Sequence, residues 1–334
     1  METRVWLRQL PDGNPSWGSC DFIFDPEVDD YDWLVVYDDL PRRSNERFQR
    51  REEVLPCPRE HTLLVTTEPS SIKTYGRAYT AQFGCVLTSQ AEWALPHSDR
   101  IWSQPALHWF YGVGRNHALS FDRLQAASPP AKTKDISMVW SGKSMRHTFH
   151  NQRFRFMRDV RAALPEMEVF GRGVRDLDDK AEALDDFRYH IAIENFIGPH
   201  HFTEKLSDPF LAFTLPFYCG CPNAADYFPE ESFIPIDATD FGAALETIQR
   251  AIRDKEYERR LPYIIEARRR VLNEYNFFAV VSREIEKRHR PASKPGHPGT
   301  VLSRYALRRK HPLIGLRHIY EKGRSRIIHA LKGK

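Results

Sequence analysis

Residues 190–221 bring together side chains that could bind a phosphate group. Apolar residues 191–193 are typical of a buried strand, and a Gly-Pro pair would end that strand. Thr203 followed by Glu204 and Lys205 is typical of a capped helix start. Backbone N–H groups at a helix start favour phosphate, and an ammonium group would add a charge-assisted hydrogen bond of about 1.5–3 kcal/mol. This stretch therefore predicts a site for a nucleotide phosphate.

The surrounding sequence predicts the elements that position this site. Strands are expected at 136–140, 189–194 and 215–219, and a strand followed by a turn at 168–173, with helices at 151–164 and from Glu204. Ser141, Gly142 and Lys143 would lead into the first of these helices. Because strands and helices alternate, the sequence predicts an α/β fold with a parallel sheet and helices on both faces.

Length and linker composition predict more than one domain. A chain of 334 residues exceeds one ordinary core. Pro and Lys residues at 128–134 are typical of a linker, which places a first domain at residues 1–130. Its alternating elements would include short apolar strands at 20–24, 33–37, 62–66 and 85–88.

The second predicted domain covers residues 131–288 and is followed by a tail. Two strongly helical segments are expected within 241–288. Residues 290–299 are rich in Pro and Gly, as in an exposed linker. Residues 289–334 would therefore consist of this linker and a basic amphipathic tail.

Composition argues against a membrane-spanning or disulfide-stabilised protein. Hydrophobic residues make up 41% and charged residues 28% of the chain, as in a soluble globular protein. No apolar run reaches the roughly 18 residues that span a bilayer. The first residues lack the pattern of a signal peptide, so a cytoplasmic location is expected. The five cysteines lack Cys-x-x-Cys spacing and are expected to be reduced and structural.

Positive charge is concentrated at the end of the chain. Residues 301–334 contain ten Lys or Arg and one acid, a net charge of +9 in a chain whose total is +4. Apolar residues recur among these charges over residues 303–334, as in a basic amphipathic helix. Such a helix could lie on an anionic membrane surface, and a solvated charged helix or a disordered tail is the alternative.

The motifs of the second half resemble glycosyltransferase family 10, the α-1,3-fucosyltransferase family, in its bacterial type. The shared pattern runs through Glu194-Asn195, Thr203–Leu206, Leu215–Tyr218 and Phe228–Ile234, with Val169–Gly173 upstream. The resemblance is strong over residues 136–240 and faint before them. It implies a GT-B fold, in which two Rossmann-like domains face each other across a cleft. It also implies transfer of L-fucose from GDP-fucose to a sugar hydroxyl, with inversion at the anomeric carbon.

The family resemblance implies that cations hold the pyrophosphate of the donor. Departure of GDP concentrates negative charge on the phosphates, so the site needs fixed positive charge there. Lys205 is the leading candidate, and Arg153 best matches an Arg that the family places on the helix after the first strand of this domain. Arg155, Arg158 and Arg161 lie on the same predicted helix, so the register stays open by a turn.

Other polar residues of the same stretch would complete the donor site, by the same resemblance. Glu204 would contact the nucleotide ribose or the fucose, with Glu194 and Asn195 lining the cleft beside it. His201 would contact the sugar or the base. Glu204 is therefore expected to act in catalysis as well as in donor binding.

An inverting transfer also needs a general base, because a sugar hydroxyl is too weak an acid to ionise by itself. In the family, a Glu that follows a strand of the acceptor domain has this role. The matching stretch here is residues 63–71, and Glu68 is the candidate base.

No metal is expected to be required, although manganese or magnesium could stimulate the reaction. Asp29, Asp30 and Asp32 could form an Asp-x-Asp manganese motif, but they are more typical of loop acids beside a strand. The pair His200 and His201 has no carboxylate or Cys partner at ligand spacing, which disfavours zinc.

The sequence therefore predicts an inverting fucosyltransferase that acts on lipopolysaccharide or another cell-surface glycan, at the inner face of the cytoplasmic membrane. Its partners would be a GDP-sugar donor, an oligosaccharide or glycolipid acceptor and, through residues 303–334, an anionic membrane surface. The same fold acting on another GDP-sugar is the first alternative. A protein that binds nucleic acid through the basic tail is the second, and the lack of an RNA-recognition motif or a helix-turn-helix disfavours it.

Overall fold

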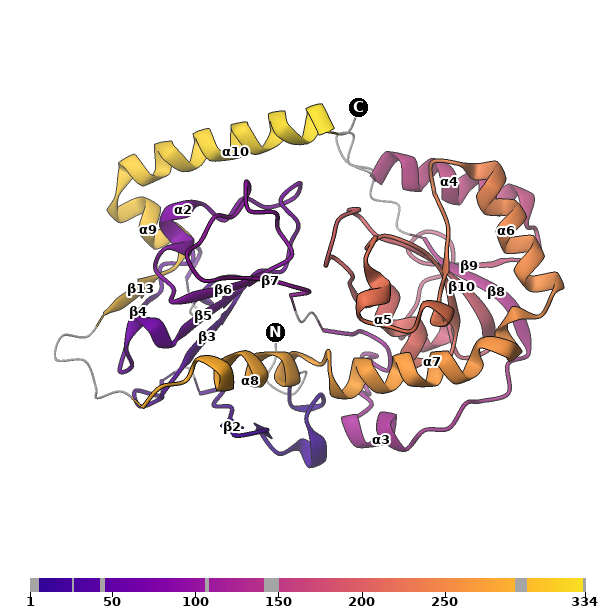
Figure 1. The fold of residues 1–334 in the computed structure, drawn as a ribbon, viewed down its shortest axis with the longest axis horizontal. Helices are drawn as coiled ribbons and strands as arrows, with labels where there is room; N and C mark the ends of the chain where they lie inside the picture. Colours follow the sequence, from indigo (N-terminus) through magenta and orange to yellow (C-terminus); the bar gives the residue numbers. More distant parts are fainter. Residues whose placement is uncertain are drawn as a thin grey trace. The chain divides into compact units, whose positions relative to one another are not determined.

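The computed structural model describes residues 6–25, 27–42, 46–105, 108–140, 150–291 and 299–332. This part of the chain forms two compact units, each with its own parallel sheet (Figure 1). Unit 1 comprises residues 1–22 and 106–282, and unit 2 comprises residues 23–105 and 283–334. The predicted segment from Ser141 to Lys143 lies outside the described residues, as does most of the predicted linker at 290–299.

The compact units divide the chain differently from the predicted segments 1–130, 131–288 and 289–334. Residues 1–22 belong to unit 1 together with residues 106–282, and residues 283–334 belong to unit 2 together with residues 23–105. The predicted linker at 128–134 is part of unit 1, because Lys132 is buried there and its Nζ donates to the carbonyl groups of Leu184 and Ala212. These contacts join residues far apart in sequence, which linker composition does not reveal.

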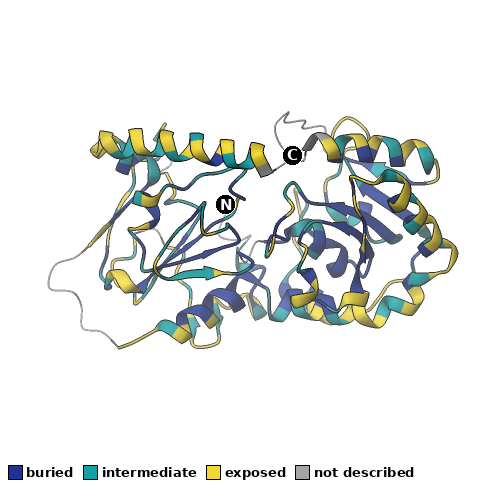
Figure 2. Ribbon diagram, turned by 45° about the horizontal axis from the view of Figure 1, so that its top comes forward, coloured by how far each residue is buried: buried dark blue, intermediate teal, exposed yellow. Residues whose placement is uncertain are grey.

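The sheet of unit 2 has four parallel strands in the order β3-β5-β6-β7. The strands are β3 (Leu34–Tyr37), β5 (Thr62–Val65), β6 (Cys85–Thr88) and β7 (Arg100–Trp102). Every residue of β5 and β6 is buried, as expected for central strands covered on both faces (Figure 2). Three of these strands match predicted apolar runs, whereas the short edge strand β7 carries no such run.

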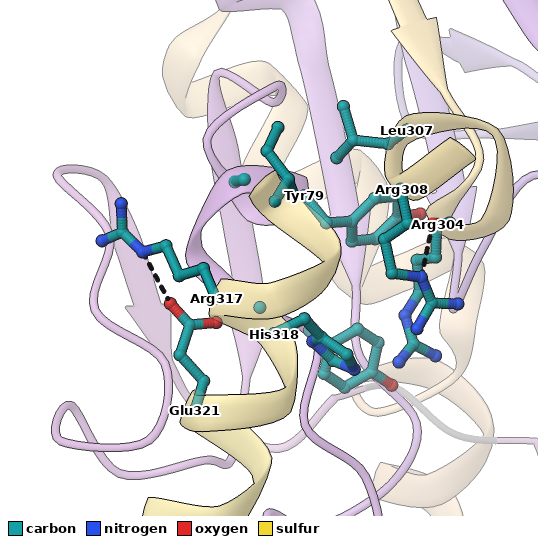
Figure 3. A pocket seen from close by; sticks show the side chains of 11 residues that line it. Tyr79, Arg304, Leu307, Arg308, Arg317, His318 and Glu321 are labelled. Carbon is teal, nitrogen blue, oxygen red and sulfur yellow. Dashed lines mark hydrogen bonds and ion pairs between the residues drawn. The ribbon is translucent and has the colours of Figure 1, made fainter. Parts of the chain in front are cut away.

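The end of the chain packs on unit 2. β13 (Thr300–Leu302) pairs antiparallel with β4 (Glu52–Val54). Helices α9 (Arg304–Lys310) and α10 (Pro312–Lys332) follow, and Figure 3 shows a pocket that they form beside α2 (Arg77–Thr80). The tail is therefore helical over these residues, which fits a helix on a membrane and a solvated charged helix equally.

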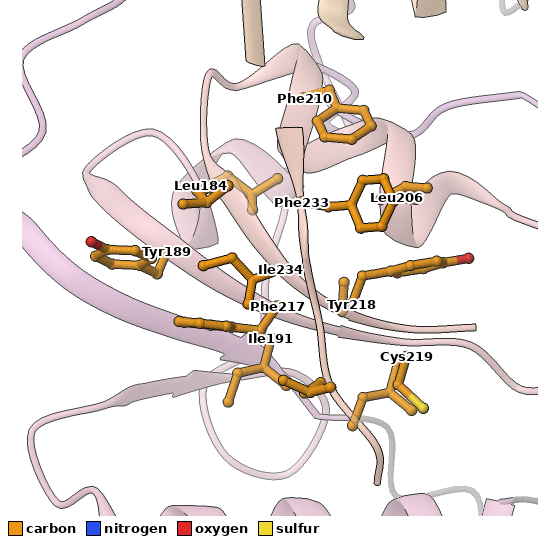
Figure 4. Packing of buried hydrophobic residues seen from close by; sticks show 14 of the residues in the cluster. Leu184, Tyr189, Ile191, Leu206, Phe210, Phe217, Tyr218, Cys219, Phe233 and Ile234 are labelled. Carbon is orange, nitrogen blue, oxygen red and sulfur yellow. The ribbon is translucent and has the colours of Figure 1, made fainter. Parts of the chain in front are cut away.

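The sheet of unit 1 has five parallel strands in the order β9-β8-β10-β11-β12. The strands are β8 (Lys134–Val139), β9 (Glu168–Phe170), β10 (Phe187–Ile193), β11 (Leu215–Cys219) and β12 (Ile234–Pro235). The core of the unit is built on β10 and β11, where the rings of Tyr189 and Phe217 stack with centroids 5.4 Å apart (Figure 4). Leu206 and Phe210 join this core from one face of α5.

The helices of unit 1 are α3 (Phe121–Ala126), α4 (His150–Ala163), α5 (Glu204–Leu211), α6 (Phe241–Arg253), α7 (Glu256–Asn273) and the start of α8 (Phe277–Arg288). The prediction of two helical segments within 241–288 is wrong, because three helices occupy this range. Lys255 has a left-handed backbone with φ +51° and separates α6 from α7.

One predicted strand of the first domain is also wrong. Within residues 20–24, only β2 (Cys20–Asp21) is extended, and it pairs antiparallel with β1 (Ser16–Trp17) in a small hairpin. The predicted α/β class is confirmed, since each unit has a central parallel sheet of the Rossmann-like kind.

Candidate functional site

The strand order of unit 1 predicts where a ligand binds. β8 and β10 are neighbours, and the chain leaves β8 toward β9 on one side but leaves β10 toward β11 on the other. In open parallel sheets, ligands bind outside the carboxyl ends of the strands at such a reversal. β10 ends at Ile193, and Glu194 and Asn195 follow at this edge.

Glu194 ties the end of β10 to the start of α5. Its side chain is fully buried and accepts hydrogen bonds from Thr203, with Oε1 2.8 Å from the backbone N and Oε2 2.8 Å from Oγ1. Burial raises the pKa of Glu194, while Lys205 and Thr203 oppose the rise. Thr203 also caps α5 by accepting a hydrogen bond from the backbone N–H of Lys205. The strand end and the helix start are thus held together.

Lys205 and Glu204 form an ion pair in the first turn of α5. Lys205 Nζ lies 2.9 Å from Glu204 Oε1 and 3.7 Å from Glu194 Oε2. Burial opposes the charge of Lys205, but Glu204 and Glu194 raise its pKa overall. Burial also opposes the charge of Glu204, but Lys205 and Lys180 bring the pKa of this carboxyl well below its usual range. Both groups are therefore charged at neutral pH, and both are partly exposed.

A second ion pair, Lys180 with Asp208, adjoins the first. Lys180 comes from the 3-10 helix that precedes β10, and its Nζ lies 2.6 Å from Asp208 Oδ2 and 3.8 Å from Glu204 Oε1. Asp208 is buried, and its Oδ1 accepts from the backbone N–H groups of Phe110 and Tyr111 at 2.9 and 3.2 Å. Burial raises the pKa of Asp208, and Lys180 opposes the rise. Asp208 therefore fixes both a cation and a loop beside the first turn of α5.

Arg153 is the member of the arginine-rich helix α4 that reaches this edge of the sheet. It is 6% exposed, and its Nη1 donates to Asn195 Oδ1 and to the carbonyl of Ile193. Within the described part of the chain, no carboxylate lies at ion-pair distance from its guanidinium group. Burial lowers the pKa of Arg153, and two nearby carboxylates oppose the change. The other predicted candidates on α4 are exposed: Arg155, Arg158 and Arg161.

His201 lies inside the loop between β10 and α5 and not at an exposed tip. It is 3% exposed, and its ring packs edge-to-face on Phe196 with centroids 5.5 Å apart. Burial, reinforced by Lys205, lowers the pKa of His201 to about 4, so the imidazole is neutral at pH 7. Because the His201 ring is buried, its position gives no support to the expected contact with the sugar or the base.

Glu68 belongs to unit 2. It is exposed, follows β5 by three residues, and its backbone carbonyl accepts from Gln90 Nε2 at 2.8 Å. At the same edge of the sheet, Asp38 follows β3 and accepts from the Thr67 hydroxyl at 2.9 Å. The structure thus places six of the seven predicted site residues in unit 1, and the role of Glu68 stays a prediction.

Lys180 and Asp208 are site residues that the sequence analysis missed. Asp208 lies one helical turn after Glu204, and this spacing is the local signal that could have found it. Lys180 carries no comparable signal, since it reaches the site from the connection between β9 and β10.

The candidate residues for disulfides and metal ligands are the cysteines and the acidic loop residues. All five cysteines are free, and four of them are buried. Asp29, Asp30 and Asp32 lie outside regular secondary structure. Over the described ranges of the chain, no group of three or more His, Cys, Asp or Glu is arranged to hold a metal ion.

Residues 129–259 match the family model described as glycosyltransferase family 10 (fucosyltransferase), C-terminal part. These residues are therefore similar to that part of the family, and the matched segment is called here the family 10 domain. This family 10 domain extends from just before β8 to the start of α7 and contains both ion pairs, Arg153 and Asn195. Glu68 lies outside it.

Curated relatives match parts of the chain. An alpha-(1,3)-fucosyltransferase, FucT, of Helicobacter pylori is 30% identical over 90 residues, which are 25% of this chain and 19% of that protein. A 4-galactosyl-N-acetylglucosaminide 3-alpha-L-fucosyltransferase, FUT6, of Pongo pygmaeus is 29% identical over 150 residues, which are 42% of this chain and 40% of that protein. The chain therefore spans less than half the length of these curated relatives.

Solved structures of fucosyltransferases also match. A crystal structure of an alpha1,3-fucosyltransferase with GDP gives a TM-score of 0.42 at 14% identity, over 76% of this chain and 82% of that chain. One with GDP-fucose gives a TM-score of 0.34 at 23% identity, over 41% of this chain and 40% of that chain. Matches this weak define no individual contact, so the site described above rests on the geometry of this chain.

Proposed function

We propose that this chain is an inverting glycosyltransferase that moves L-fucose from GDP-fucose to a hydroxyl of an acceptor glycan, forming an α-1,3 linkage. The family 10 domain and the fucosyltransferase relatives support this activity. The observation that carries the proposal is the group of Arg153, Glu204 and Lys205 at the carboxyl end of β10, inside the matched domain. The acceptor would be lipopolysaccharide or another cell-surface glycan, in oligosaccharide or glycolipid form.

Arg153 and Lys205 would hold the pyrophosphate of the donor. The guanidinium of Arg153 has no ion-pair partner among the described residues and can accept an anion without breaking a salt bridge. Lys205 lies between two carboxylates, so its ammonium group stays protonated while phosphate approaches from the exposed side. These fixed cations would stabilise the charge that develops on departing GDP. We therefore expect donor binding without added metal, with manganese or magnesium at most stimulatory.

Glu204 would contact the ribose or the fucose, and Glu68 would act as the general base. In a direct displacement, the acceptor hydroxyl gives its proton to the Glu68 carboxylate while its oxygen bonds to the anomeric carbon. The bond from that carbon to the pyrophosphate oxygen breaks, and its electron pair leaves with GDP. The exposure of Glu68 at the carboxyl end of β5 supports this role, because an acceptor can reach it.

We also propose that α10 rests on an anionic membrane, at the inner face of the cytoplasmic membrane. Among the helices of the described chain, none is both long and apolar enough to cross a bilayer. α10 instead carries a row of apolar side chains that are 64–79% exposed, called here the α10 stripe: Leu313, Leu316, Tyr320, Ile327 and Leu331. An exposed apolar row beside many Lys and Arg residues is typical of a helix that lies in a membrane interface.

Calorimetric titration of the full chain with GDP, GDP-fucose, GDP-mannose and UDP-sugars tests the proposal, first with EDTA and then with manganese. Binding of GDP and GDP-fucose, with loss of GDP affinity in Lys205→Ala, is expected. Preference for another GDP-sugar would keep the fold and replace the donor. Binding of no nucleotide sugar would contradict the proposal and favour the nucleic-acid alternative.

A further inference from the structure

Unit 2 contains a pocket between α2, α9 and α10 that no step of the proposed reaction uses (Figure 3). We name it the α9–α10 pocket. Its walls include Tyr75 before α2, Arg304 and Arg308 on α9, and Arg317 and His318 on α10. Every lining residue belongs to unit 2, so the pocket is formed within one compact unit.

Two guanidinium groups of this pocket have backbone partners but, among the described residues, no carboxylate at ion-pair distance. Arg304 Nη2 donates to the carbonyl of Thr74 at 2.8 Å, and Arg308 Nε donates to the carbonyl of Arg304 at 2.9 Å. Arg304 Nε is buried and has no hydrogen-bond partner. Asp39 accepts from the backbone N–H of Arg304 at 3.1 Å, which leaves the guanidinium available. A buried donor without a partner is destabilising, so an acceptor placed here would be stabilising.

Burial and the positive charges of the pocket lower the pKa values of two of its side chains, Arg308 on α9 and His318 on α10. Burial lowers the pKa of Arg308, Arg304 lowers it further, and Asp39 opposes the change. Burial also lowers the pKa of His318 to about 4, with Arg308 and Arg304 as the next causes. Glu321 does not cancel this charge, because one of its oxygens accepts from Arg317 at 3.2 Å and the other from a backbone N–H of α2 at 3.2 Å.

We propose that the α9–α10 pocket binds a phosphate group. Its oxygens would accept hydrogen bonds from Arg304 and Arg308, which stand one helical turn apart, and guanidinium groups match phosphate oxygens in paired geometry. Arg317, which is more than half exposed, would attract the anion from solvent. A lipid head group and a free phosphate share this chemistry. Exposed Leu313 and Leu316 on the same turns of α10 as Arg317 favour the lipid as the source.

The test compares binding of two probes to the full chain and to a matched pair of variants. The probes are inorganic phosphate, measured by calorimetry, and phosphatidylcholine vesicles with or without phosphatidylglycerol, measured by flotation. Arg308→Gln removes a charge from the pocket, and Arg309→Gln removes the same charge from an exposed neighbouring position. Arg308→Gln should weaken binding about tenfold or more, and Arg309→Gln less than about twofold, because the lost bond is charge-assisted.

The outcomes separate the two sources and can refute the site. Loss of phosphate binding in Arg308→Gln alone identifies a free-phosphate site, whereas loss of phosphatidylglycerol-dependent flotation alone identifies a head-group site. Equal losses in both variants, or no binding of either probe by the wild type, would overturn the proposal. If Arg308→Gln lowers the melting temperature strongly, the more exposed Arg317→Gln replaces it. GDP titration of the same variants keeps this result distinct from the donor site, since GDP affinity should not change.

Discussion

Arg153 differs from the other arginines of α4 in burial and in its partners, which makes it a sharp probe of the donor site. Arg153→Gln is expected to weaken GDP binding by about 1.5–3 kcal/mol, roughly 10- to 100-fold, because a charge-assisted bond to phosphate is lost. Arg155→Gln on the exposed face of the same helix should leave GDP affinity unchanged. Calorimetry measures both, and equal losses would show that α4 attracts GDP only by its overall charge.

Glu68 is expected to affect turnover and not donor binding. Glu68→Gln keeps the size of the side chain but cannot accept the acceptor proton, so kcat should fall about 100-fold or more while GDP affinity stays the same. Glu60→Gln, at an exposed position before β5, provides the control. Loss of GDP binding in Glu68→Gln would place this residue on the donor side.

His190 makes the stability of unit 1 depend on pH. It is buried in β10, and its Nδ1 lies 2.8 Å from the hydroxyl oxygen of Ser137, whose proton is donated to the carbonyl of Ala183. His190 Nδ1 must therefore donate, which fits a neutral imidazole. Burial lowers the pKa of His190 to about 3, whereas an unfolded histidine titrates near about 6.5.

Because the unfolded state takes up this proton first, the contribution of His190 to stability is lost as pH falls below about 6.5. At pH 5 the loss is about 2 kcal/mol. In His190→Gln, the free energy of unfolding should therefore change by about 2 kcal/mol less between pH 7 and pH 5 than in the wild type. Urea unfolding measures this difference, with exposed His311→Gln as the control. An unchanged pH dependence in His190→Gln would refute the assignment.

α10 combines an anchored face with an exposed one. Ser325 donates to the carbonyl of Ser70 at 3.2 Å, and His329 Nε2 lies 3.0 Å from the Ser70 hydroxyl, so polar contacts hold one face on unit 2. The other face carries the α10 stripe, and exposed residues follow one side of the helix in Figure 2. Apolar side chains left in water on a helix so anchored gain free energy by entering a membrane interface.

Replacing two residues of the α10 stripe is expected to weaken membrane binding. Leu316→Ser with Tyr320→Ser removes apolar surface worth about 1.5–3 kcal/mol per side chain, so binding to phosphatidylglycerol vesicles should fall at least tenfold. Ala330→Ser, at an exposed position of α10, should have little effect. Flotation of the full chain measures the change, and unchanged binding by the double variant would refute the interfacial role of the stripe.

The two compact units give a prediction for the whole chain. GDP should slow amide hydrogen exchange over residues 193–211, because the end of β10, the following loop and α5 surround the proposed phosphate site. Bound at about 100 times its Kd, a ligand stabilises the folded state by about 2.7 kcal/mol, enough to suppress local opening. The α9–α10 pocket in unit 2 should show no change. Protection confined to unit 2 would move the donor site there.

Features that depend on neighbours in sequence could be predicted. The apolar runs of β5, β6, β10 and β11 lie where the sequence analysis placed strands, since apolar periodicity reflects burial directly. The cap of α5 at Thr203 was also predicted, because capping involves residues two or three positions apart. The α/β class and the local motif of the donor site follow from such short-range patterns.

Other features were decided by packing between distant residues. Arg153 was the best match among four arginines of α4, and the register stayed open by a turn until β10 placed the carbonyl of Ile193 and the side chain of Asn195 beside it. Lys180 joins Asp208 across 28 positions of the chain, and residues 283–334 return to unit 2. Short-range patterns indicate which side chains prefer burial. The pairing of charged groups depends instead on strand order and helix packing, which form only when the whole chain folds.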